Sequence, residues 1–240
     1  MITERFKKEI LNYVDNLLGF NPTGLYIVKD SIDGNCDADE APIYTNIDER
    51  FDLDLSELNY AVGASKFVIF YNSNWVIKIP FTGYYWEEED LTPILEGYWD
   101  DTNPCDEEMA IYDNASKDLK KLLVPNYFIG WINGLIPIYI QRRVKASYCY
   151  IERKEVMSKS SPIQKKIATR VIGDWRRLFN SDIRGILLNI FGIKRLKDIA
   201  FEIDALSDLH NNNIGFMSNG DFAIFDYAGY TSLSWSNYEN

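Results

Sequence analysis

The chain has 240 residues, of which 46% are hydrophobic and 15% aromatic, and its formal net charge is −11. This length and apolar content can bury the core of one large domain or two small lobes, and they exclude a disordered chain. No apolar run approaches the roughly 18 residues of a membrane-spanning helix. The acidic balance also argues against nucleic-acid binding, because the phosphate backbone repels negative charge.

The cysteines and the first residues predict a cytoplasmic location. Cys36, Cys105 and Cys149 are odd in number and form no C-x-x-C spacing. We therefore expect free thiols in a reducing compartment rather than a disulfide framework or a zinc site. The opening "MITERFKKEILNYVDNLLGF" is charged and amphipathic, unlike a secretory signal peptide.

Charge is distributed unevenly along the chain. Residues 141–200 hold fifteen Lys and Arg against five Asp and Glu, whereas residues 1–140 hold ten against twenty-five. Residues 201–240 hold six acids and no Lys or Arg. Solvated faces of opposite sign are the simplest interpretation. A basic region at 142–197 that docks a partner, such as an acidic protein or a nucleic acid, is the alternative.

The first segment, residues 1–57, is predicted to be a helix with an acidic extension. Apolar residues at helical spacing predict a helix over residues 3–19 that ends at Gly19. The segment 30–57 is acidic and rich in turn-forming residues, so it is predicted to lie across the surface.

Residues 58–144 are predicted to form a β-rich lobe. "KFVIFY" (66–71) and "WVIKIPF" (75–81), separated by "NSN", predict one hairpin. "NYFIGW" (126–131) and "LIPIYIQRRV" (135–144), joined through Asn-Gly, predict a second hairpin.

The other segments are predicted to be mainly helical. Residues 86–108 are acidic and contain two prolines, which indicates a loop leading into a helix at about 105–122. After residue 145, apolar residues at helical spacing that follow Ser161-Pro162 predict one helix. Residues 194–207 predict another. "DFAIFD" (221–226) predicts a last strand. The whole is therefore an α+β chain with a second, helical lobe at 145–240.

Two charged residues interrupt apolar strands, where an unpaired charge is costly. Lys78 has isoleucine on both sides, and Asp226 ends the run "AIF". A lysine that emerges at a sheet edge is the simple interpretation of Lys78, and an ammonium held against phosphates is the functional one. Upstream, Gly63 in "AVGASKF" allows close backbone approach, and the amides that follow it can bind an anion.

The segment "LSDLHNNNIGF" (206–216) contains further candidates. Asn213 lies five positions after Asp208, and Asp226 lies eighteen after Asp208. Carboxylate and amide oxygens are ligands that Mg²⁺ accepts, and the remaining acid can orient a hydroxyl. These three residues are therefore candidates for a magnesium-dependent phosphotransfer site.

"DLHNNNIGF…FDYAG" resembles the catalytic and metal loops of the protein-kinase-like superfamily, in the D-L-H-x-x-N form of aminoglycoside-phosphotransferase-type and other atypical kinases. "VGASKFVIFYNSNWVIKIP" is similar to the glycine loop, hairpin and phosphate-binding lysine of that superfamily. The chain is also similar to small kinase-like proteins of bacteriophages. The resemblance spans roughly residues 58–228. It implies a two-lobed kinase-like fold with a small, truncated helical C-lobe, ATP and Mg²⁺ as cofactors, and phosphotransferase activity.

The resemblance also implies catalytic and metal-binding roles. Lys78 would contact the α- and β-phosphates and pair with Glu108, for which Glu107 is the alternative. Asp208 would be the catalytic base or the acid that orients the acceptor hydroxyl. Asn213 and Asp226 would hold Mg²⁺.

Nucleotide-binding roles follow from the same resemblance. Gly63, Ala64 and Ser65 would cover the phosphates, and Ile140 with Gln141 would form the hinge that meets adenine. His210, the single histidine, would brace the loop by hydrogen bonding and not act as the base.

Two classes of function stay open. One is an ATP- and Mg²⁺-dependent phosphotransferase that acts on a hydroxyl of an unknown protein or small molecule. The other is a nucleotide-binding pseudokinase that acts as an interaction module for a host protein. Leu206 stands where the family usually places a supporting histidine. Only fourteen residues follow Asp226, so we expect no activation segment and exclude a regulated eukaryotic-type kinase. No membrane partner is expected.

Overall fold

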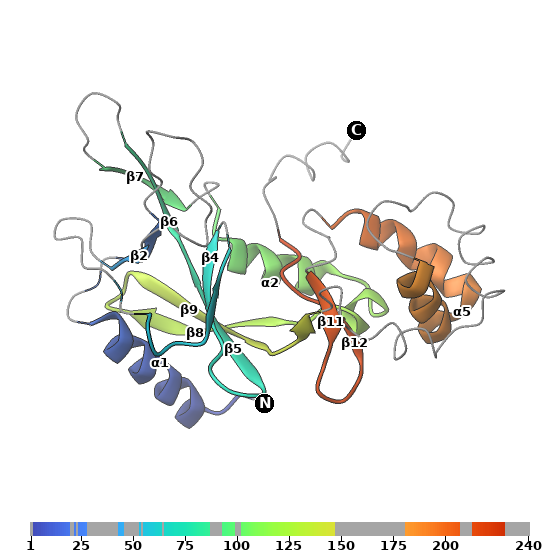
Figure 1. The fold of residues 1–240 in the computed structure, drawn as a ribbon. Coiled ribbons are helices and arrows are strands. Elements are labelled where there is room, and N and C mark those ends of the chain that lie inside the picture. The colour runs from blue at the N-terminus through green and yellow to red at the C-terminus, as the bar shows by residue number, and fades with distance from the viewer. Residues whose placement is uncertain are drawn as a thin grey trace. The chain divides into compact units, whose positions relative to one another are not determined.

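The computed structural model describes residues 2–19, 22, 24–27, 43–45, 53, 55–63, 65–86, 93–98, 102–146, 181–206 and 213–228. The chain is a mixture of helices and mainly antiparallel strands (Figure 1). It divides into two compact units. Unit 1 comprises Met1–Met109 and Asn126–Arg143, and unit 2 comprises Ala110–Pro125 and Val144–Asn240. Among the helices described, none is long and apolar enough to cross a membrane.

A five-stranded antiparallel sheet forms the centre of unit 1. Its strand order is β3-β4-β5-β9-β8, with bounds β3 Tyr60–Val62, β4 Lys66–Ile69, β5 Trp75–Pro80, β8 Asn126–Ile132 and β9 Ile136–Arg142. Both predicted hairpins are confirmed. Asn72 closes the first turn, because its side-chain oxygen accepts hydrogen bonds from the backbone N–H groups of Asn74 and Trp75. Asn133 and Gly134 have φ values of 51° and 69°, as the tight Asn-Gly hairpin turn requires.

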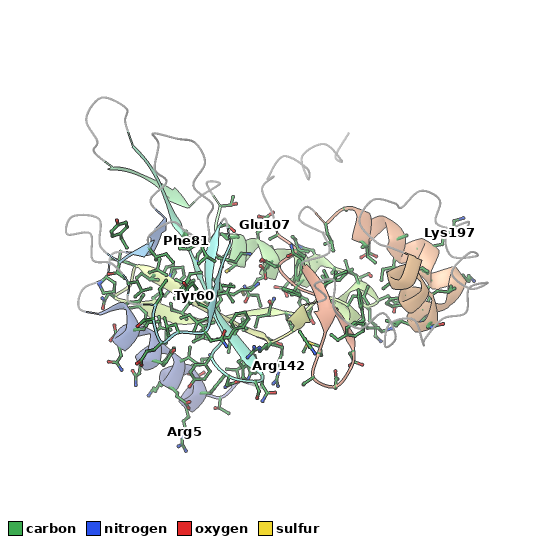
Figure 2. The ribbon with its side chains drawn as sticks, viewed as in Figure 1. Arg5, Tyr60, Phe81, Glu107, Arg142 and Lys197 are labelled. Carbon is green, nitrogen blue, oxygen red and sulfur yellow. The ribbon has the colours of Figure 1, made fainter. Side chains whose placement is uncertain are left out.

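One face of this sheet is apolar and is covered by α1, Glu4–Leu18 (Figure 1). Strand alternation places isoleucines and Phe67 on this face, opposite Ile10 and Val14 of the helix. The helix begins where the Thr3 hydroxyl accepts a hydrogen bond from the Phe6 N–H, and Arg5 projects away from the sheet (Figure 2). The predicted helix over residues 3–19 is therefore confirmed.

Gly130 lets α1 lie close to the sheet. The register of β8 against β9 shifts between Phe128 and Gly130, and Gly130 has a φ of 153° at this irregularity. A Cβ atom at Gly130 would lie 2.9 Å from Leu11 Cδ1. The close approach of helix and strand therefore depends on the missing side chain.

A second sheet of unit 1 has the order β2-β1-β6-β7. Its strands are β1 Tyr26–Ile27, β2 Ile43–Tyr44, β6 Thr82–Trp86 and β7 Pro93–Tyr98. The prediction that residues 86–108 form a loop is wrong over 93–98. Proline indicated a loop, but Pro93 is the first residue of β7, a position where a strand tolerates the missing N–H.

The helix predicted at about 105–122 is shorter than expected. It is α2, Pro104–Asn114, and a separate 3₁₀ turn, η1, follows at Leu119–Lys121. The Ser116 hydroxyl accepts a hydrogen bond from the Leu119 N–H and so starts the new turn. Local capping by serine therefore ends the helical run that the apolar pattern alone would have extended.

Unit 2 combines α5, Ser181–Asp204, with a small sheet of order β10-β11-β12. Its strands are β10 Lys145–Ala146, β11 Ile214–Phe216 and β12 Phe222–Ile224. The helix predicted at 194–207 is the second part of α5, which breaks at Gly192 (φ 70°). The last predicted strand is β12, whereas β11 was not predicted. The helix predicted after Ser161 lies outside the described residues.

Among the described residues of unit 2, apolar side chains of η1, α5, β11 and β12 belong to one buried cluster. Its larger members are Leu119, Leu122, Leu123, Leu187, Leu188, Phe191, Leu196, Ile199, Ile203, Leu206, Ile214, Phe222, Ile224 and Tyr227. This core joins η1 and α5 to β11 and β12, so it fixes the loop ends that carry two of the candidate site residues.

We predict that Gly215→Ala destabilises unit 2. A Cβ atom at Gly215 would overlap the carbonyl oxygen of Lys145 and lie 2.8 Å from the Val144 Cγ1 atom. Because the obstacle is backbone of the neighbouring strand, we expect a loss of about 1–3 kcal/mol in the free energy of unfolding. Hydrogen–deuterium exchange should show faster amide exchange in peptides that contain β10 and β11.

Gly63→Ala is the matched control for this prediction. A Cβ atom at Gly63 would lie 3.6 Å from the Lys66 carbonyl oxygen, an ordinary van der Waals contact. Its effect should therefore stay within about 0.5 kcal/mol. Equal effects of the two substitutions would contradict a steric role for Gly215.

Candidate functional site

A buried cluster of charges lies on the polar face of the five-stranded sheet, opposite the α1 side. Lys78 Nζ on β5 lies 2.9 Å from Glu108 Oε1 and 2.8 Å from Oε2, both on α2. Lys78 is 2% exposed and Glu108 is fully buried. The structure thus brings together the lysine and the glutamate that the sequence resemblance pairs. The distances are those of charge-assisted hydrogen bonds.

Strand register explains why polar side chains gather on this face. Lys78 pairs with Val68 on one side and with Tyr139 on the other, and residues directly opposite each other point to the same face. Gln141 lies two positions beyond Tyr139 and so shares that face. Residues one position away, such as Ile77 and Ile140, point to the apolar side.

The first turn of α2 is fixed to β9 by a hydrogen-bonded network. Asn103 caps the helix, since its side-chain oxygen accepts from the Cys105 N–H at 3.0 Å. The amide group of Asn103 donates to the Tyr139 hydroxyl at 2.7 Å, and that hydroxyl donates to Asp106 Oδ1 at 2.6 Å. Burial and the bond to Asp106 raise the pKa of Tyr139 well above its usual range. The phenol therefore stays protonated and holds α2 in place.

This network determines which acid of α2 faces the lysines. Asn103 and Asp106 are tied to Tyr139, and Glu108 is fully buried. Glu107, which is labelled in Figure 2, is only half-buried. The structure contains the pairing of Glu108 with Lys78.

Gln141 belongs to the same cluster. Its side-chain N–H donates to Glu108 Oε2 at 3.2 Å, and the residue is 1% exposed. The side chain that the resemblance assigns to the adenine hinge is thus engaged with the glutamate, while Ile140 lies in the apolar core. A hinge role for these two residues stays a prediction, and their strand is paired on both sides, with β5 and with β8.

Lys66 is a member of the cluster that the sequence did not reveal. Its Nζ atom lies 2.9 Å from Glu108 Oε1, and the residue is 3% exposed. Lys66 pairs with Pro80, two positions from Lys78, so both lysines are on one face. The hairpin turn at 72–74 was predicted correctly, and counting back from it would have placed Lys66 beside Lys78.

The turn between β3 and β4 contains the residues predicted to cover phosphates. The Gly63 N–H donates to the Lys66 carbonyl at 3.0 Å, and the Ser65 carbonyl accepts from the Phe81 N–H at 2.9 Å. These bonds make a tight hairpin that is also tied to the end of β5. Ala64 lies outside the described residues.

In unit 2, the structure brings Asn213 and Asp226 together. Asn213 Nδ2 donates to the Asp226 carbonyl at 2.7 Å, and the Phe225 N–H donates to the Asn213 carbonyl at 2.9 Å. Asp226 adopts a left-handed backbone with a φ of 54°. This conformation is tolerated best by glycine, asparagine and aspartate, and it clusters at functional sites.

The neighbours of Asp226 are anchored on both sides. Ile224 exchanges backbone hydrogen bonds with the segment 122–124, and the Tyr227 hydroxyl donates to the Val124 carbonyl at 3.2 Å. Asp226 is therefore presented from a fixed turn. Asp208 and His210 lie outside the described residues, which contain no cluster of three or more His, Cys, Asp or Glu suited to a metal.

Comparison of the chain with models of protein families, with curated proteins and with solved structures gives no match. The function is therefore inferred from the geometry of two groups of residues, the charged cluster around Glu108 and the pair Asn213 and Asp226.

We predict that Glu108→Gln destabilises unit 1 strongly. The substitution leaves the ammonium groups of Lys66 and Lys78 buried without the carboxylate that both contact. Loss of one partner of a buried ion pair costs about 3–5 kcal/mol. Denaturant unfolding followed by tryptophan fluorescence should show this loss, whereas Asp113→Asn, at an exposed position of the same helix, should change stability by less than about 0.5 kcal/mol.

The triple variant Lys66→Met, Lys78→Met, Glu108→Leu tests the cause of that loss. Apolar side chains of similar volume need no charge partner, so most of the lost stability should return. A triple variant as unstable as Glu108→Gln would show that packing rather than unpaired charge is responsible.

We also predict that Asp226→Ala is less stable than Asp226→Asn by about 1 kcal/mol, because alanine tolerates a φ of 54° poorly. Thermal unfolding of the two variants side by side measures this difference. Equal stability would mean that the left-handed backbone at this position carries no strain.

Proposed function

We propose that the chain binds MgATP and transfers the γ-phosphoryl group to a hydroxyl of a protein or small-molecule acceptor. The observation that carries the proposal is the buried ion pair between Lys78, inside an apolar strand, and Glu108 on a helix. A lysine held in this way presents a fixed positive charge, and phosphoryl transfer depends mainly on such positioned charges.

The proposed roles on the nucleotide side fall to unit 1. Lys78 binds the α- and β-phosphates, and Glu108 keeps the ammonium group in place. The turn Gly63–Ser65 covers the phosphates with its backbone amides other than the Gly63 N–H, which the Lys66 carbonyl already accepts. The tight hairpin and its bond to Phe81 support this role, because a fixed turn loses little entropy when it binds.

The proposed roles on the metal side fall to unit 2. Asn213 and Asp226 supply amide and carboxylate oxygens, the donor chemistry that Mg²⁺ prefers, and the Asn213 side chain donates to the Asp226 backbone carbonyl at 2.7 Å. When bound, Mg²⁺ neutralises charge on the transferring phosphate. Asp208 accepts or orients the proton of the acceptor hydroxyl.

We further propose that the chain has the two lobes of an atypical kinase-like fold, with a β-rich N-lobe at 58–144 and a truncated helical C-lobe at 145–240. The division into units differs from these ranges at Ala110–Pro125, which belongs to unit 2. Support comes from the order of the parts along the chain. A glycine turn, a hairpin with a lysine, a helix with a glutamate, a second hairpin and a paired Asn and Asp follow one another as the sequence resemblance implies.

A nucleotide-binding pseudokinase is the second candidate, and Leu206 favours it. Leu206 stands where the resembling family usually has a histidine, and it is 5% exposed within the apolar core of unit 2. An apolar side chain gives Asp208 no hydrogen bond, so the acid lacks one support for its catalytic role. In this case, nucleotide binding would regulate an interaction with a host protein.

Incubation with γ-labelled ATP and Mg²⁺ tests the main proposal. We expect transfer to the protein itself or to a lysate component, lost in Asp208→Asn and Asp226→Asn and kept in Asp198→Asn. Asp198 is an exposed acid on α5 and serves as the matched control. Saturation with MgATP at about a hundred times Kd should also stabilise the fold by about 2.7 kcal/mol.

The outcomes separate the two candidates. Stabilisation by MgATP without any transfer supports the pseudokinase. If the protein neither binds nor transfers, both proposals are wrong. Transfer that survives in Asp226→Asn would contradict the metal role of that residue.

A further inference from the structure

We infer that Lys66 is a second phosphate-binding cation, so that two lysines rather than one hold the polyphosphate of the nucleotide. This inference rests on the proposed function and extends it. It starts from the observation that two ammonium groups, from Lys66 and Lys78, lie 2.9 Å from the same oxygen, Glu108 Oε1.

The position of Lys66 follows from the hairpin. β4 and β5 pair so that Lys66 lies diagonally across from Lys78, with Val68 and Pro80 completing the face. Diagonal neighbours on one face are within reach of long side chains. Both ammonium groups therefore lie next to Glu108 Oε1. Any anion bound by Lys78 is within reach of Lys66.

Stability does not explain the second lysine. Burial of an ammonium group costs several kcal/mol, and the attraction to a carboxylate rarely exceeds this penalty. Lys78 contacts both oxygens of Glu108, and Lys66 shares one of these oxygens, Oε1, with it. A methionine at position 66 would fill similar volume without the desolvation cost. The charge of Lys66 thus calls for a role in binding an anion.

The backbone of Lys66 connects it to the proposed phosphate cover. Its carbonyl accepts the Gly63 N–H at 3.0 Å and so closes the turn Gly63–Ser65. Lys66 thus lies at the end of the turn that covers the phosphates in the proposed function. An ammonium group has three donors, so it can bond a phosphate oxygen alongside Glu108 or in its place.

The ligand class that fits two adjacent ammonium groups is a polyphosphate. Lys78 keeps its bond to Glu108 Oε2, and Lys66 exchanges its contact with Oε1 for a phosphate oxygen. Negative charge that is spread over several phosphates can engage both lysines at once. Adenosine lacks this charge and is expected to bind independently of Lys66.

Calorimetric titration of Lys66→Met with MgATP and with adenosine tests the inference. We expect MgATP to bind about ten- to a hundredfold more weakly than to the unsubstituted protein, which is the effect of one lost hydrogen bond between charged groups. Adenosine affinity should be unchanged. Lys8→Met, at an exposed position of α1, is the control and should bind both ligands normally.

The results distinguish failure of this inference from failure of the proposed function. If Lys66→Met binds MgATP as the unsubstituted protein does while Lys78→Met binds weakly, Lys66 is structural and the inference is overturned alone. If the unsubstituted protein does not bind MgATP, the proposed function is overturned and the inference with it.

A labelling experiment on the unsubstituted protein covers the case in which Lys66→Met does not fold. An acyl-phosphate derivative of ATP carries its acyl group at the phosphate end. A nearby lysine amine attacks the acyl carbon, an amide forms, and ATP leaves. Mass spectrometry should find the label on both Lys66 and Lys78, and excess MgATP should prevent it. Label on Lys78 without label on Lys66 would overturn the inference.

Discussion

The carboxylate of Glu108 is the point on which unit 1 depends. It is fully buried, and it accepts hydrogen bonds from Lys66, Lys78 and Gln141, which come from three neighbouring strands. A single acid on α2 thus fixes the helix to β4, β5 and β9. A buried ion cluster contributes little net stability compared with an apolar core, but it accepts few alternative arrangements. The polar face of the sheet therefore fixes the position of α2, while the apolar face and α1 contribute most of the stability.

The burial and fixed position of Lys78 are also the properties that suit it to phosphate binding. A lysine that has lost its solvent shell and is already ordered can bind a phosphate without a further entropic cost. Tyr139 extends this order, because its hydroxyl joins the cap of α2 to Asp106 and keeps the helix in register with β9. In unit 2, the left-handed turn at Asp226 is ordered in the same manner by Asn213 and the segment 122–124. Both sets of residues are held by the protein before any ligand binds.

For unit 1, sequence patterns predicted most helices and strands correctly, but they did not predict the contacts between strands or every element boundary. Both hairpins followed from alternation and turn residues, and the pairing of Lys78 with Glu108 followed from the family resemblance. Lys66 was missed because its place beside Lys78 follows from the register of β4 against β5, which the hairpin turn fixes and alternation within one strand does not. β7 was missed because Pro93 suggested a loop, and the end of α2 was misplaced because Ser116 starts a new turn. β11 was missed because asparagines before it indicated a loop. Each failure concerns a tertiary or capping interaction that a local pattern does not contain.

The place of β9 in the sheet has a consequence for synthesis of the chain on the ribosome. β9 lies between β5 and β8, yet it is the last strand of the five to be translated. Until residue 142 has emerged, β5 has one unpaired edge, and the sheet cannot close over its isoleucines. The segment 110–125, which belongs to unit 2, must leave the ribosome before unit 1 is complete. A nascent chain paused in this interval presents an open strand edge, the form in which β-proteins aggregate or recruit chaperones.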